Sequence, residues 1–136
     1  MNPSDDAVRA LLQAARTARI HAYAPYSSFP VGAALLAEDG RVFTGVNVEN
    51  ASYGLATCAE RTAVTKAVSE GARRFLAIAV IGAHDGVACP PCGSCRQILH
   101  EMGPDLVVIT EAEDGAPVRT PLRTLLPFAF GGDRLG

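Results

Sequence analysis

The chain has 136 residues, of which 49% are hydrophobic and 19% charged, and its formal net charge is −2. This length fits one domain, and the composition excludes an intrinsically disordered chain. Proteins that bind a nucleic-acid backbone need clustered Lys and Arg, which this sequence lacks. We therefore expect a single globular domain, residues 1–136, that acts on a small molecule.

No apolar run of the sequence is long enough to cross a bilayer, because Asp, Glu, Arg or His interrupts each one. The first residues do not combine a basic stretch with an apolar one, as a secretory signal would. We expect a cytoplasmic protein with no membrane partner, whose cysteines stay reduced.

The first half of the chain predicts a helix and then a β-hairpin. Apolar residues recur at three- and four-residue steps over residues 5–23, with Ser4 as N-cap and Pro25 ending the helix. Residues 31–37 and 41–48 are predicted to be strands, because they flank an Asp-Gly dipeptide, a strong hairpin signal.

The second half predicts alternating helices and strands. A helix is expected from residue 57 or 58 to Glu70, with Gly71 in the left-handed position that follows it. The apolar run 75–81 indicates a strand covered on both faces. Another helix is expected from Pro91-Cys92 to Gly103-Pro104, and another strand over residues 106–110.

The end of the chain decides the topology. Only about seven residues separate Thr110 from Val118, and a parallel crossover needs about a dozen, so the last strand should return antiparallel. Thr120-Pro121 then opens a short helix with Pro at its first position, closing near Leu126. The prediction is a three-layer α/β/α fold with a mixed sheet of about five strands.

The four cysteines are the strongest chemical signal in the sequence: Cys58, Cys89, Cys92 and Cys95. In a reducing compartment such a cluster indicates a metal or redox site rather than disulfides. Cys92 and Cys95 are three apart, so they share a face of the predicted helix, and Cys58 starts the preceding helix. Helix N-termini favour thiolates, and thiolates select zinc over magnesium or calcium.

The number of thiolate ligands separates a catalytic zinc site from a structural one. Three ligands leave a position for water, whereas a fourth closes the site. Cys89 is the candidate fourth ligand, but the prolines at 90 and 91 favour an extended segment that carries it away as a small buried hydrophobe. The spacing favours the open site without excluding the closed one.

Glu60 favours a catalytic site. Two residues after Cys58, its carboxylate is poorly placed as a ligand, but it can take a proton from water at the metal and return it to a substrate. Three thiolates leave zinc with a net negative charge, and Arg61 is the nearest cation in sequence that can donate to the sulfurs, although a surface position fits it equally well. Three other residues lack metal-ligand spacing: His21, His84 and His100.

Five segments of the chain match one known family in its order: residues 25–35 (PYSSFPVGAAL), 47–51 (NVENA), 58–63 (CAERTA), 91–97 (PCGSCRQ) and 125–130 (LLPFAF). They resemble the short, three-cysteine cytidine deaminases, and the likeness covers nearly the whole chain. Related deaminases that act on nucleobases carry His-x-Glu. Cys58 stands at that histidine position here, which fits the free-nucleoside branch.

The resemblance implies a zinc-dependent hydrolase of pyrimidine salvage that converts free cytidine, and deoxycytidine, to uridine or deoxyuridine and ammonia. It implies one Zn²⁺ per subunit, with Cys58, Cys92 and Cys95 as ligands. It further implies that Glu60 shuttles the proton and that Arg61 donates to the thiolates. Cys89 lies outside the family's metal motif, so the resemblance gives it no role.

The resemblance also implies the substrate contacts: Asn47 and Glu49 to the ribose, Phe29 on the pyrimidine, the Ala59 backbone at the base carbonyl edge, and Phe130 from a neighbouring subunit of a homotetramer. Asn47 and Glu49 are two apart on a predicted strand, so they project from one face. A buried acceptor such as Glu49 would reject a ligand without hydroxyls, because its carboxylate would be left unpaired. The apolar tail at 125–132 is hard for so small a chain to bury alone, which favours a homo-oligomer; the alternative is that Phe128 and Phe130 pack the last helix onto the chain's own core.

Three alternatives remain. A structural four-cysteine zinc module and a thiol redox protein both explain the cysteines, but both leave Glu60 and the segment 47–50 without a role. A redox pair would also normally follow the first strand, whereas this Cys-x-x-Cys unit follows the third. A deaminase of the blasticidin type shares the zinc motifs, but the Asn-Val-Glu-Asn segment at 47–50 favours an ordinary ribonucleoside.

Overall fold

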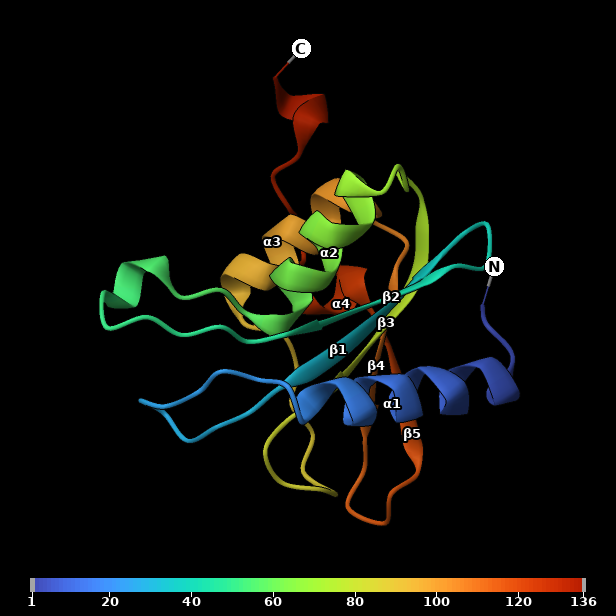
Figure 1. The fold of residues 1–136 in the computed structure, drawn as a ribbon. Helices are drawn as coiled ribbons and strands as arrows, with labels where there is room; N and C mark the ends of the chain where they lie inside the picture. Colours follow the sequence, from blue (N-terminus) through green and yellow to red (C-terminus); the bar gives the residue numbers. More distant parts are fainter. Residues whose placement is uncertain (1, 136) are drawn as a thin grey trace.

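A computed structural model describes residues 2–135 and contains one five-stranded sheet with helices on both faces (Figure 1). The strands lie in the order β2-β1-β3-β4-β5, and β3 and β4 are parallel whereas the other neighbours are antiparallel. The predicted mixed sheet, three-layer fold and antiparallel last strand are confirmed. The strands are β1 (Gly32–Ala37), β2 (Val42–Val46), β3 (Phe75–Ile81), β4 (Val107–Glu111) and β5 (Pro117–Pro121).

One helix, α1 (Asp5–Arg19), covers one face of the sheet (Figure 1). The Ser4 hydroxyl accepts the N–H of Ala7 at 3.1 Å, which confirms the predicted N-cap. The helix buries its apolar stripe against β1 and β3. A Cβ at Gly32 of β1 would overlap the carbonyl oxygen of Ala15, so glycine lets the helix backbone rest directly on the strand.

The predicted end of the first helix at residue 23 is wrong, because α1 ends at Arg19. Beyond it, the Tyr23 N–H donates to the carbonyl of Asn47 at 3.0 Å, and the Glu49 N–H donates to the carbonyl of Tyr23 at 2.9 Å. This pairing forms an isolated parallel bridge between Tyr23 and Val48. A contact with a distant segment therefore replaces the last helical turn that local periodicity predicted.

The other face carries α2 (Ala59–Ser69), α3 (Gly93–Met102) and the short α4 (Leu122–Leu125). Gly71 after α2 has φ +97, as expected from the sequence. Pro121 is the N-cap of α4 and the last residue of β5 rather than the first helical residue, which corrects that prediction by one position. Two 3-10 turns were not predicted: η1 (Tyr53–Leu55) and η2 (Gly132–Arg134).

Two arginines of α1 hold the loop between β3 and α3. Arg16 forms an ion pair with Glu111, a buried carboxylate at the end of β4 that also accepts the Gly86 N–H at 3.0 Å. Arg19 donates to the carbonyl of Gly82 at 2.7 Å. This loop leads to Cys92, so α1 helps to fix the approach to α3 from the far side of the sheet. Within residues 2–135, every helix is too short or too polar to span a membrane.

Candidate active site

The N-termini of α2 and α3 bring three cysteines together. Cys58 is the N-cap of α2, Cys92 is the N-cap of α3, and Cys95 lies in the first turn of α3. Their sulfur atoms all lie within 4.8 Å of one another, a separation compatible with one shared metal ion. Cys89 is not a member of this group within the described residues, so the observed cluster has three thiols, as an open site requires.

The thiols differ in how easily they ionise. Burial raises the pKa of Cys58, and burial with the negative charges of Glu60 and Cys58 raises that of Cys95. Burial also acts to raise the pKa of Cys92, but hydrogen bonds with Ser94, Cys95 and Cys58 outweigh it and lower the pKa to about 7. One thiol thus ionises readily, whereas the other two need a bound cation, and zinc suits three sulfur ligands.

Glu60 lies in the first turn of α2, one residue beyond Ala59, and its residue surface is only 5% exposed. Burial raises the pKa of the carboxyl, against the opposing effect of hydrogen bonds with its own backbone N–H and with Cys95. A buried carboxyl with a raised pKa is suited to accept a proton and return it. It lines a cleft of about 290 Å³ together with Cys58 and Cys92.

Gly45 of β2 fixes the position of α2. A Cβ at Gly45 would overlap the carbonyl oxygen of Ala59 and lie 2.5 Å from the backbone nitrogen of Ala63. Only glycine therefore allows the first turn of the helix to pack backbone against backbone on the strand. Because β2 leads within two residues to Asn47, this contact sets the cysteine-bearing helix end beside the predicted sugar-binding pair.

Asn47 and Glu49 both line the cleft, but β2 ends at Val46, so they do not lie on a strand as predicted. They flank Val48, which forms isolated bridges with Tyr23 and Thr57. The Asn47 side chain accepts the N–H of Val31 at 2.8 Å and donates to the carbonyl of Phe29 at 2.9 Å. Asn47 therefore holds the backbone on both sides of Pro30, from the Phe29 carbonyl to the Val31 N–H.

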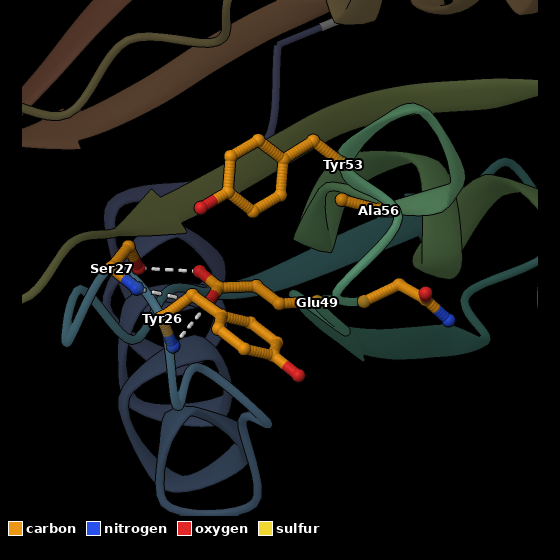
Figure 2. Close-up of a pocket in the computed structure, with 6 residues that line it drawn as sticks. Tyr26, Ser27, Glu49, Tyr53 and Ala56 are labelled. Carbon is orange, nitrogen blue, oxygen red and sulfur yellow. Dashed lines mark hydrogen bonds between the residues drawn. The ribbon is translucent and has the colours of Figure 1, made fainter.

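The Glu49 carboxylate holds the same loop from its other end (Figure 2). Its Oε1 accepts the N–H groups of Tyr26 and Ser27 at 3.0 and 3.1 Å, and its Oε2 accepts the Ser27 hydroxyl. The Ser27 hydroxyl and then the Ser27 N–H lower the pKa of Glu49, and together with the smaller effect of the Tyr26 N–H they outweigh desolvation, which acts to raise it. Glu49 is thus a fixed, charged acceptor. It borders a second hollow of about 340 Å³, which Tyr26 and Tyr53 also line.

Phe29 forms an apolar wall of the cleft, and it is supported by His84 and Gly82, to which the sequence reasoning gave no role in the site. The ring of His84 packs edge-on against it with a centroid distance of 5.9 Å. A Cβ at Gly82 would meet the Cys89 Sγ at 3.0 Å and Phe29 Cζ at 3.3 Å, so glycine makes room for both. Cys89 lines the cleft and is half-buried, rather than fully buried and remote as expected.

Two predicted site residues lie away from the cleft within the single chain. Arg61 is exposed, and between residues 2 and 135 its side chain forms no hydrogen bond or ion pair. The Phe130 carbonyl accepts a hydrogen bond from Gln97 of α3 at 2.8 Å, while the residue is 58% exposed. Both roles stay predictions. Arg96, which the sequence reasoning missed, ties Pro91 to α4 by donating to the carbonyls of Pro91 and Leu125.

The family model for the cytidine and deoxycytidylate deaminase zinc-binding region matches residues 5–111, a span that contains the three thiols and Glu60. The chain belongs to this family of zinc-binding deaminases. It is 47% identical over 130 residues to a cytidine deaminase of Sporosarcina psychrophila, covering 94% of each chain. A cytidine deaminase of Halalkalibacterium halodurans is 51% identical over 121 residues, covering 88% of this chain and 91% of the relative.

Solved structures of the family share the fold. The crystal structure of a cytidine deaminase from Burkholderia pseudomallei superposes with a TM-score of 0.83 at 53% sequence identity, covering 90% of this chain and 98% of that one. The expected zinc cofactor and deaminase fold are therefore confirmed, and the three-thiol group within the described residues fits one zinc ion per chain.

Proposed function

We propose that the chain catalyses the hydrolysis of free cytidine and deoxycytidine to uridine or deoxyuridine and ammonia. The observation that carries this proposal is that Glu60, a buried carboxyl with a raised pKa, borders one cleft with Cys58 and Cys92. A closed structural zinc site has no use for such a proton carrier, and a redox pair has no use for the third thiol. The relatives named as cytidine deaminases support the choice of substrate.

The chain's own residues account for the proton movements. Cys58, Cys92 and Cys95 would hold zinc, which, when bound, supplies a water molecule of lowered pKa as the nucleophile at C4. Glu60 takes the proton released by that water and delivers it to N3 of the base. It then takes the proton of the new hydroxyl at C4 and passes it to the amino group, so the C4–N bond breaks, ammonia leaves and the carbonyl of uridine forms.

The other cleft residues would orient the nucleoside. Phe29 packs on the pyrimidine, and the Ala59 backbone contacts the carbonyl edge of the base. Asn47 and Glu49 contact the ribose hydroxyls. The support is that Phe29, Asn47, Glu49 and Ala59 line the same cleft as two of the three clustered thiols, and that Glu49 is held as an ionised acceptor. A charged acceptor held in this way favours ligands that carry a hydroxyl to donate to it.

We infer further that the enzyme is a homotetramer in which Phe130 contacts the substrate of a neighbouring subunit. Phe130 is 58% and Phe128 95% exposed, and Phe128 adopts a left-handed φ of 54. Two exposed aromatic rings on one short segment are the apolar surface that a partner covers. Light scattering should give a tetramer, and a mixture of Phe130→Ala with Glu60→Gln should regain activity through hybrid sites. An active monomer contradicts this proposal.

We also propose a cytoplasmic role in pyrimidine salvage. Three thiols that must bind zinc need a reducing compartment, because oxidation to a disulfide would remove two ligands. A free nucleoside as substrate and uridine as product fit the recovery of pyrimidines rather than the editing of nucleic acid, and the net charge of −2 agrees with a small-molecule partner.

Ultraviolet-monitored incubation with cytidine tests the function, with zinc measured on the same sample. We expect conversion to uridine and one zinc per chain, and loss of both when a chelator strips the metal. Stoichiometric zinc without any turnover of cytidine or deoxycytidine would favour the structural module. Turnover of an aminonucleoside antibiotic in place of cytidine would favour the blasticidin-type deaminase.

A further inference from the structure

The Ser27 hydroxyl lies between two residues expected to hold opposite ends of the nucleoside. It donates to Oε2 of Glu49, and it accepts the backbone N–H of Phe29 at 3.0 Å. Ser27 also lines both the cysteine-containing cleft and the neighbouring hollow that Figure 2 displays. No other side chain of the described loop 25–31 contacts both Glu49 and the Phe29 backbone.

The direction of these hydrogen bonds is fixed by chemistry. An ionised carboxylate only accepts, and a backbone N–H only donates, so the single hydroxyl proton of Ser27 must point to Glu49. The two lone-pair sites of Glu49 Oε1 are taken by the N–H groups of Tyr26 and Ser27. Among residues 2–135, Oε2 accepts only the Ser27 hydroxyl, so it retains one acceptor site for a ligand.

We propose that Ser27 is a positioning residue for ribose recognition, whose hydroxyl, oriented by the Phe29 N–H, fixes Glu49 so that a single acceptor site is left for a sugar hydroxyl. The proposal rests on the proposed function. It adds a residue that acts through Glu49 and does not itself react. A carboxylate held by three donors from one loop is pre-organised, which lowers the entropic cost of binding the sugar.

The two residues expected to bind the sugar are linked to the Phe29 backbone in different ways. The Asn47 side chain hydrogen-bonds directly to the backbone around Phe29: it donates to the Phe29 carbonyl and accepts the Val31 N–H. The Glu49 carboxylate reaches the Phe29 backbone only through Ser27. Removing the Ser27 hydroxyl should therefore loosen Glu49 while leaving Asn47 and its two hydrogen bonds in place.

The test compares Ser27→Ala with wild type, both loaded with zinc, on cytidine and on 2′,3′-dideoxycytidine, which lacks both secondary hydroxyls. Wild-type turnover of cytidine is measured first, because its absence refutes the proposed function and not the role of Ser27. We expect KM for cytidine to rise about tenfold with kcat nearly unchanged, since one hydrogen bond to a charged group is lost. For the dideoxynucleoside, KM should be the same in both enzymes.

Controls distinguish positioning from a general structural effect. Ser69→Ala removes an exposed serine at the end of α2 and should match wild type. Ser27→Thr keeps a hydroxyl and should stay near wild type, and Ser27→Ala should add little to Glu49→Gln because the two act as a unit. An unchanged KM for cytidine, an equal rise for both nucleosides, or a threonine variant as poor as alanine would each overturn the proposal.

Discussion

The two halves of the cleft are built by different means. The thiol half is held by helix termini: Cys58 and Cys92 are N-caps, and Glu60 lies in the first turn of α2. The sugar half is held by a loop whose backbone groups are hydrogen-bonded to the side chains of Asn47 and Glu49. In the first half the backbone positions the functional side chains, whereas in the second the functional side chains position the backbone.

This difference assigns different consequences to mutations. A residue of the thiol half can be replaced with little effect on its neighbours, because the helices stay where their cores place them. A residue of the sugar half carries two tasks, since Asn47 both holds the Phe29 segment and is expected to bind the ribose. Mutations in the thiol half should therefore lower activity alone, whereas mutations in the sugar half should lower both activity and the stability of the loop.

The largest effect is expected from the metal ligands. Cys58→Ala removes one of three thiolates and should abolish zinc binding and activity together. Cys89→Ala is the matched control, because this thiol lies in the same cleft but outside the three-sulfur group. Zinc content and turnover measured on both variants decide the point. Loss of zinc from the Cys89 variant would instead indicate a closed, four-thiolate site.

Glu60→Gln tests whether the thiol half separates binding from chemistry. The amide keeps the size of the side chain but cannot carry the proton, so kcat should fall by about 10²–10⁴ with zinc still bound. Single-turnover kinetics and a nucleoside-binding titration provide the measurements. Near-normal turnover in a zinc-loaded Glu60→Gln sample would remove this carboxyl from the mechanism.

Asn47→Ala tests the double task of the sugar half. The change removes the acceptor of the Val31 N–H and the donor to the Phe29 carbonyl. We expect an unfolding free energy lower by about 1–3 kcal/mol, and a kcat/KM for cytidine lower by about tenfold or more. Thermal denaturation and steady-state kinetics measure the two effects. Lost activity with unchanged stability would mean that Asn47 binds the sugar without supporting the loop.

The smallest effect is expected from Arg61→Ala. If the assembled enzyme turns this exposed guanidinium toward the thiolates, removing it should weaken zinc affinity by about tenfold. Competition with a chromophoric chelator measures the affinity. The control is Arg9→Ala, which removes an exposed arginine of α1 that pairs with Asp6. Identical zinc affinity in wild type and the Arg61 variant would leave this residue as surface charge.

The sequence predicted the thiol half well because its signals are local. Spacing alone placed Cys92 and Cys95 on one helix start, and the apolar run 75–81 matched β3 residue for residue. The sugar half depends on contacts between distant segments. Tyr23 pairs with Val48, and the helix predicted to reach residue 23 stops at Arg19, because that pairing forms only after folding.

The same reason explains the residues that were missed. Ser27 lies inside a segment that carried the family resemblance, yet its contact with Glu49 spans a separation along the chain that no periodicity encodes. Contact of His84 with Phe29 likewise follows from the course of the loop between β3 and α3. Cys89 was placed correctly outside the three-sulfur group, but its place in the cleft wall depended on Gly82 leaving space.

Gly45 also affects which lengths of nucleoside the cleft can accept. Because α2 rests on β2 backbone against backbone, the span between the Cys58 end of the helix and Asn47 is a fixed length that side-chain repacking cannot stretch. If Asn47 binds the sugar as proposed, this span sets the distance between the reacting carbon and the sugar hydroxyl. Adaptation to a longer or shorter nucleoside would have to change the loops that close the rest of the cleft, such as 25–31, whose backbone is held by the side chains of Asn47 and Glu49.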